Sequence, residues 1–91
     1  MAGDRLELPG IEFPCDFAVK AIGPAGGGLE GEVVAVVRRH APDLGEGAVR
    51  TRPSAGGRYL AVTVRLRARS REQLERIYRE LHALESVLMV L

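Results

Sequence analysis

The side chains best suited to chemistry in this 91-residue chain are arginines gathered in its middle. Residues 47–71 contain no aspartate or glutamate but seven arginines, namely Arg50, Arg52, Arg58, Arg65, Arg67, Arg69 and Arg71. Guanidinium groups bind phosphates and carboxylates, so this segment is a candidate surface for nucleic acid or an acidic partner. A second explanation for the abundance of arginine stays open. Arginine outnumbers lysine twelve to one, as a GC-rich coding genome would produce, and the net charge is only +1.

Alternation along two predicted strands would gather part of this charge on one face of a sheet. If Val49 and Thr51 face the helices, the arginines between and after them face away. The candidate anion or partner face then consists of Arg50, Arg52, Arg65, Arg67, Tyr59 and Lys20. RNA-binding sheets of this topology stack bases on two or three aromatic side chains, and here Tyr59 alone is placed to do so. The sequence therefore favours a solvated face that protects a sheet edge, with a nucleic-acid site as the alternative.

The histidines and the cysteine form no catalytic or metal-binding pattern. His40 and His82 fall on different predicted helices, without a second ligand four residues away, and Cys15 is distant from both. No Ser-His-Asp or paired-carboxylate set stands out, so we expect no catalytic residue, no metal and no cofactor. A lone cysteine permits no internal disulfide, and the N-terminus lacks the pattern of a signal peptide. The sequence therefore predicts a cytoplasmic protein that is not an enzyme.

A glycine-rich loop precedes the first predicted helix and is a candidate small-ligand loop. Its glycines are Gly23, Gly26, Gly27 and Gly28. Exposed backbone amides at a helix start can bind an anion. However, the loop lacks the Gly-Lys-Ser/Thr ending of a P-loop, and Glu30 and Glu32 in the first helical turn would repel phosphate. A flexible connection is therefore favoured over a phosphate site.

Hydrophobic periodicity predicts the elements that position these residues. Strands are predicted at residues 17–22, 48–52, 59–68 and 87–91, with helices at 29–40 and from the Ser70–Gln73 capping box to about residue 84. The order β-α-β-β-α-β predicts an α+β ferredoxin-like sandwich. It has a four-stranded antiparallel sheet in the order 4-1-3-2 and both helices on one face. Residues 1–12 are predicted to form a flexible arm and 13–91 a single domain, without a membrane span.

The chain ends on an apolar run that is predicted to be an edge strand. The run is Val87, Leu88, Met89, Val90 and Leu91. One face of this strand would pack on the helices, and the other would join Ala18 and Ile22 on the open face of the sheet. An apolar edge beside an apolar patch is a candidate association edge, which predicts a homodimer or a protein partner. Cover by the N-terminal arm is the alternative, through Leu6, Leu8, Ile11 and Phe13.

Several short motifs occur in an order that resembles one family of small bacterial proteins. They are Phe13-Pro14-Cys15-Asp16-Phe17 with Lys20 and Gly23, Arg39-His40-Ala41-Pro42, Arg52-Pro53-Ser54, Gly57-Arg58-Tyr59, Ser70-Arg71-Glu72-Gln73-Leu74 and Val90-Leu91. Over residues 13–91 the chain resembles the YbeD-like proteins. This resemblance implies a cytoplasmic bacterial protein of unknown function with an ACT-like fold and no catalytic residues to transfer.

The resemblance also bears on ligands. By analogy with ACT domains, a small zwitterionic molecule is a candidate ligand of the glycine-rich loop, and a regulatory link to lipoate metabolism has been suggested for the family. We therefore expect a non-catalytic regulatory or binding module that binds a ligand or a protein in the manner of ACT domains. A nucleic-acid-binding module that uses the arginine-rich face is the alternative, and a small enzyme is the least favoured class.

Overall fold

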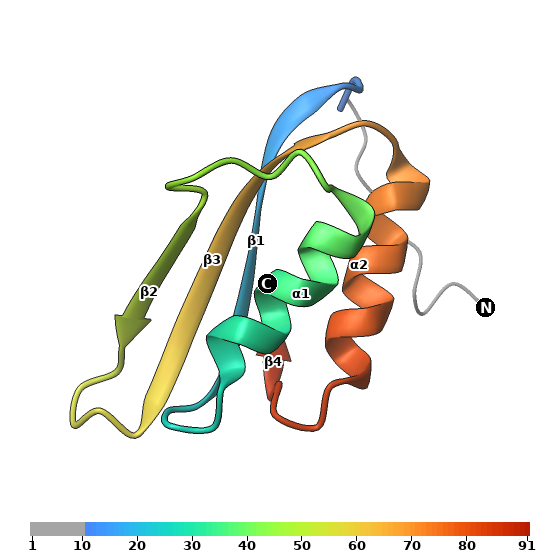
Figure 1. The fold of residues 1–91 in the computed structure, drawn as a ribbon. Helices are drawn as coiled ribbons and strands as arrows, with labels where there is room; N and C mark the ends of the chain where they lie inside the picture. Colours follow the sequence, from blue (N-terminus) through green and yellow to red (C-terminus); the bar gives the residue numbers. More distant parts are fainter. Residues whose placement is uncertain (1–10) are drawn as a thin grey trace.

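The computed structural model describes residues 11–91, which follow the predicted β-α-β-β-α-β order (Figure 1). The elements are β1 (Cys15–Pro24), α1 (Leu29–His40), β2 (Val49–Pro53), β3 (Tyr59–Ala68), α2 (Arg71–Ala83) and β4 (Met89–Val90). Most of the predicted arm, including Leu6 and Leu8, lies outside the described residues. Across residues 11–91, neither helix has the length and apolar character needed to cross a bilayer.

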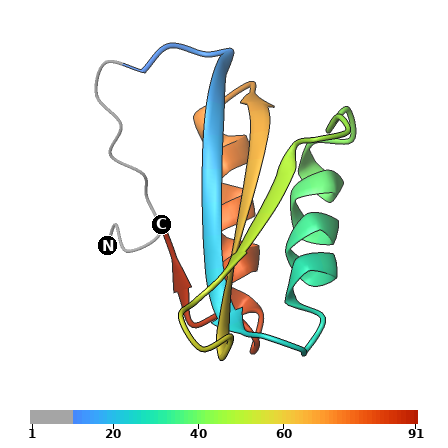
Figure 2. The ribbon, with the colours of Figure 1, turned by 90° about the vertical axis from the view of Figure 1, so that its left-hand side faces the viewer.

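The strands form one antiparallel sheet in the order β2-β3-β1-β4, which confirms the predicted order 4-1-3-2. β1 and β3 pair along their full length, from Cys15 opposite Ala68 to Pro24 opposite Tyr59. Both helices lie on the same side of the sheet in Figure 1, and Figure 2 shows α2 behind the strands. The fold is therefore the predicted α+β ferredoxin-like sandwich, in which the two helices of residues 11–91 leave one sheet face uncovered.

Alternating apolar side chains of the central strands meet the apolar stripes of the helices. Val19 and Ala21 of β1 and Val62 and Val64 of β3 are fully buried. The helices contribute Leu29, Val33, Val36, Val37, Leu74, Ile77 and Leu81, each at most 3% exposed. Because side chains alternate between the two faces of a strand, this burial forces the intervening residues onto the open face. The core thus determines which side chains the open face presents.

β2 is more exposed than its sequence predicts. Thr51 pairs with buried Val62, which places it on the helix side as predicted, yet Thr51 is exposed. The helices pack mainly on β1, β3 and β4, and β2 stands apart from both of them in Figure 1. The residues from Arg50 to Pro53 are consequently exposed on both sides of the strand. β2 is a projecting edge strand rather than a half-buried one.

β4 is shorter than predicted, because the α2–β4 connection uses part of the apolar run. The backbone N–H of Val87 donates to the Leu84 carbonyl at 3.1 Å, so Val87 lies in a turn and packs against the core rather than in the strand. Hydrogen bonds to β1 nevertheless extend beyond the strand, since the Leu88 N–H donates to Ile22 and the Leu91 N–H donates to Lys20, both at 2.8 Å. The end of the chain is therefore docked on the sheet.

The start of α2 follows the predicted capping box with one change. The Ser70 hydroxyl accepts a hydrogen bond from the backbone N–H of Gln73 at 3.1 Å, as an N-cap does. The Gln73 side chain reaches back one residue further than a standard capping box would, and its Oε1 accepts from the Arg69 N–H at 2.7 Å. The helix start is thereby fixed to the end of β3.

Candidate functional site

Four cationic side chains surround a shallow groove on the open face of the sheet. The register places Arg50 opposite Thr63, and Thr63 opposite Lys20, across three strands. The groove has a volume of about 450 Å³ and is lined by Lys20, Arg50, Thr51, Arg52, Ala61, Thr63 and Arg65. Ala61 and Thr63 are short and partly buried, whereas the long cationic side chains beside them are exposed. This arrangement makes a concave surface with positive sides, which we call the basic groove.

The lining of the basic groove contains no carboxylate, which makes it suited to anions. Two members of the predicted face lie outside it. Arg67 pairs instead with Asp16, with 3.2 Å between Nη1 and Oδ1, and Tyr59 lies beyond Ala61, opposite Pro24 at the end of β3. Four of the six predicted residues, Lys20, Arg50, Arg52 and Arg65, are therefore brought together.

A larger cavity of about 630 Å³ lies between the C-terminal half of β3 and the loop that follows α1. Its lining is Asp16, Phe17, Ala18, Ala41, Asp43, Leu44, Gly45, Arg65, Leu66 and Arg67. It exists because β2 begins only at Val49 and leaves this part of β3 paired with β1 alone. The cavity carries charges of both signs, since Asp16 pairs with Arg67 and Asp43 pairs with Arg69 at 3.2 Å. The sequence does not reveal this cavity, because it depends on where β2 starts.

The opposite edge of the sheet is apolar. Leu88, Met89 and Leu91 are 63%, 51% and 59% exposed, respectively. Met89 lies opposite Ile22 on β1, so the predicted apolar half of the open face is present. Val87 and Val90, the other two residues of the predicted association edge, pack against the core. We call Leu88, Met89 and Leu91 the apolar edge.

The glycine-rich loop divides into a structural glycine and exposed ones. Gly23 is buried, and a Cβ atom built on it would lie 2.0 Å from the Ser86 carbonyl oxygen. The Ser86 hydroxyl also donates to Glu32 in the first turn of α1. Gly26, Gly27 and Gly28 are exposed with no atom near their Cβ positions. Gly23 therefore allows the α2–β4 turn to approach β1 closely, while the other three form an open loop.

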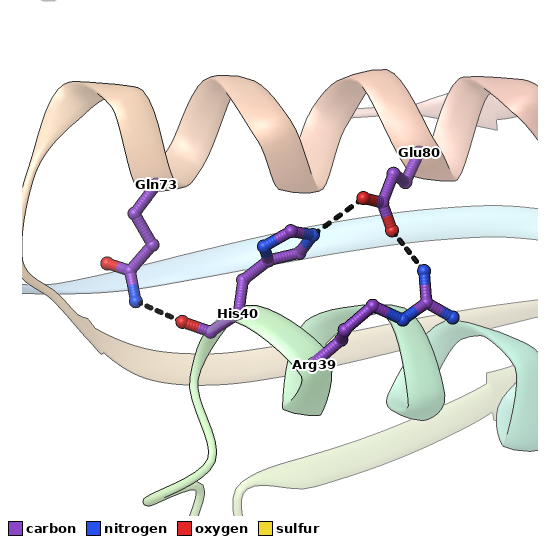
Figure 3. A network of polar contacts seen from close by, with 4 residues as sticks. All are labelled: Arg39, His40, Gln73 and Glu80. Atoms are coloured by element: carbon purple, nitrogen blue, oxygen red, sulfur yellow. Dashed lines mark hydrogen bonds and ion pairs between the residues drawn. The ribbon is translucent and has the colours of Figure 1, made fainter.

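A polar network that the sequence analysis missed joins the two helices (Figure 3). Glu80 of α2 accepts from Arg39 and lies 2.8 Å from His40 Nε2. The hydrogen bond from His40 holds the pKa of the Glu80 carboxyl below its ordinary value of 4.5, and the positive charge of Arg39 acts in the same direction. Buried Gln73 donates from Nε2 to the His40 carbonyl at 2.7 Å. His40 thus forms a bridge between the two helices through its side chain and its backbone carbonyl.

Tyr78 connects α2 to the docked end of the chain. Its hydroxyl donates to the Leu91 carbonyl at 3.3 Å, and its ring meets Phe17 edge-on with 6.5 Å between ring centroids. Burial raises the pKa of the Tyr78 hydroxyl above its ordinary value of 10.0. The hydrogen bond and the ring contact tie β4 and β1 to the helix layer.

The described residues present charged and apolar surface on different parts of the sheet. Within residues 11–91, no three His, Cys, Asp or Glu side chains lie close enough together to hold a metal ion. The geometry provides a groove lined by cationic side chains toward one edge of the sheet and an exposed apolar segment at the other edge.

Comparisons with known proteins place the chain among bacterial proteins of unknown function. A family described as "Protein of unknown function (DUF493)" matches residues 9–91. A UPF0250 protein of Azotobacter vinelandii is 45% identical over 92 residues that span all of both chains, and one of Hahella chejuensis is 37% identical over 91 residues, again spanning both. The solution structure of a protein from H. pylori superposes with a TM-score of 0.71 at 12% identity, covering 93% of this chain and 89% of that one.

Proposed function

The chain belongs to the DUF493 family, whose members include the UPF0250 proteins, and we propose that it is a non-catalytic binding module that self-associates through its sheet. Membership confirms the resemblance to the YbeD-like proteins, a family without an assigned activity. The proposal places this module in the cytoplasm and assigns it a regulatory role, exercised by binding rather than by chemistry.

The apolar edge is the observation that carries this proposal. Three large apolar side chains, Leu88, Met89 and Leu91, are each more than half exposed in or next to β4, a strand that has no neighbour on its outer side in the described part of the chain. A sheet edge of this kind is a template for pairing with another strand, and proteins usually protect it with charges. β4 carries no charged side chain.

A second copy of the chain is the partner that fits this edge. Antiparallel pairing of two β4 strands around a two-fold axis would place the same apolar side chains of both copies against each other and continue the sheet across the interface. The apolar contact would include Ile22, which lies opposite Met89 on the open face. Such an interface is self-complementary because both copies contribute the same uncharged strand, β4.

Light scattering coupled to size-exclusion chromatography tests this assignment. We expect a mass of twice the 9.9 kDa of one chain, which falls to the monomer value in Met89→Lys and Leu88→Lys variants, since a charge would be buried at the interface. Ala35→Lys, which adds the same charge on the exposed side of α1, serves as the matched control and should remain dimeric. Circular dichroism checks that each variant is folded. A wild-type chain that stays monomeric at millimolar concentration would contradict the proposal.

Nucleic acid remains the alternative partner, and the basic groove is the feature that favours it. Phosphate contacts by Lys20, Arg50, Arg52 and Arg65 would give binding that weakens steeply with salt. Single-stranded binding also draws on aromatic side chains that stack with bases, and Tyr59 lies outside the groove lining. We therefore retain nucleic acid as a competing occupant, to be measured beside the acidic segment considered next.

A further inference from the structure

We propose that the outer edge of β2 accepts an acidic segment of a different protein, which adds to the sheet as an extended strand beside Arg50 and Arg52. This inference deepens the proposed function, because it treats the sheet as a binding surface, but it uses the edge opposite to the one that would self-associate. The partner is defined by its chemistry: carboxylates at alternate positions of an extended chain.

The backbone of β2 is accessible in the way that strand addition requires. β2 is the last strand on its side of the described sheet, and neither helix covers it (Figure 1). Four of its five residues are exposed. An extended peptide that pairs with such an edge gains main-chain hydrogen bonds, while its alternate side chains meet those of the edge strand. The neighbouring β3 is fully paired with β1 and provides a rigid support.

The charges on β2 match an acidic strand in spacing and direction. Arg50 and Arg52 project to the same face and lie two positions apart, which is about 6.7 Å along a strand. Carboxylates at alternate positions of an added strand have the same spacing and would lie about 5 Å across from the arginines, within reach of ion pairs. Arg65, on β3, adds positive charge to the same groove. No carboxylate in the groove lining competes for these cations.

The same charges select against a second copy of the chain at this edge. Two β2 strands paired around a two-fold axis would bring Arg50 and Arg52 of one copy beside those of the other, and like charges directly opposite each other are unfavourable. β2 is thus protected from self-association but complementary to an acidic strand, whereas the apolar edge at β4 has the reverse character.

Fluorescence anisotropy with synthetic peptides tests the proposal on the full chain. The probe is a fluorescein-labelled ten-residue peptide of alternating glutamate and threonine at low salt. We expect saturable binding that weakens about tenfold in an Arg50→Gln/Arg52→Gln double variant, equivalent to ~1.4 kcal/mol. The matched control, Arg38→Gln/Arg76→Gln, removes two exposed arginines from the helices and should change affinity less than about twofold. Thermal melting confirms that both double variants are folded.

Three further probes separate the proposed mode from other anion binding. The same peptide with every backbone amide methylated should not bind, because it cannot form the ladder of hydrogen bonds. A peptide with its glutamates in one block and its threonines in another should bind more weakly than the alternating one. Oligouridine, the third probe, should bind more weakly than the alternating peptide. The proposal would be overturned if the methylated or the block peptide bound as tightly as the alternating one, or if oligouridine bound more tightly. It would also be overturned if both double variants lost the same affinity, or if the alternating peptide did not bind at all. None of these results alters the light-scattering test, so failure here is distinguishable from failure of the proposed self-association.

Discussion

At Gly23 the chain has no room for a side chain, because a Cβ atom there would lie 2.0 Å from the carbonyl oxygen of Ser86. A Gly23→Ala variant must therefore push the α2–β4 turn away from β1. We expect it to lower the free energy of unfolding by about 2–3 kcal/mol in urea titrations, as overpacked positions do. Gly27→Ala is the matched control, since nothing lies near its Cβ position, and it should change stability by less than about 0.5 kcal/mol. Equal effects at both positions would contradict the close approach.

Glu80 makes a pH-dependent contribution to stability. Its folded-state pKa lies below the ordinary value of 4.5, chiefly because of the hydrogen bond from His40, so the native state binds fewer protons than the unfolded state. The stabilisation is therefore present above that ordinary value and is lost as the pH falls through the folded-state pKa. We expect Glu80→Gln to lower stability by under about 1 kcal/mol at neutral pH and by progressively less toward about pH 3.

Urea titrations at several pH values check this expectation, with Glu85→Gln as the control. Glu85 is an exposed carboxylate beyond the end of α2, so its replacement tests whether any lost negative charge has the same effect. A wild-type minus Glu80→Gln difference that stays constant between neutral and acidic pH would show that the Glu80 carboxylate does not supply the stabilisation.

At the scale of elements, α2 depends on its cap. The Ser70 hydroxyl satisfies the Gln73 backbone N–H, which the helix itself cannot pair. We expect Ser70→Ala to lower the free energy of unfolding by about 1 kcal/mol, and Ser70→Asp to restore most of that loss because aspartate is also a good N-cap. Urea titrations of the three proteins measure the difference. If Ser70→Asp were as unstable as Ser70→Ala, the loss would not come from the cap.

The elements also show which features of the fold a sequence can reveal. The alternation from Leu60 to Ala68 predicts β3 because period-two patterns have a direct geometric cause. The predicted start of β4 lies two residues too early, since a uniformly apolar run has no period from which a turn at Val87 can be recognised. The contact of His40 with Glu80 joins residues 40 positions apart on neighbouring helices, so no local pattern contains it.

The candidate site likewise contains some features that the sequence reveals and others that it does not. Strand alternation places Lys20, Arg50 and Arg65 around the basic groove, because burial of the alternate side chains in the core leaves these residues on the open face of the sheet. The exposure of Thr51 and the cavity beside β3 depend instead on how far the helices and β2 extend, which the side-chain pattern of β2 does not encode.

At the scale of the whole molecule, the two edges of the sheet have opposite character. β2 is cationic and β4 is apolar, and β3 and β1 separate them, at about 4.8 Å per strand spacing. A dimer formed through β4 would leave a β2 strand at each outer end of the continued sheet. Each copy could then bind an acidic segment while remaining paired with the other. Self-association and partner binding would in this way coexist in one module.

This arrangement predicts that the two binding events are separable by mutation. We expect Met89→Lys to be monomeric yet to bind the alternating glutamate–threonine peptide within about twofold of the wild-type affinity, because distant and independent sites contribute additively. Conversely, Arg50→Gln/Arg52→Gln should remain dimeric in light scattering while binding the peptide about tenfold more weakly. A variant carrying all three changes should show both losses, each of the size seen alone. If Met89→Lys also abolished peptide binding in a folded monomer, the acidic segment would require the dimer, and the two edges would have to form one composite site.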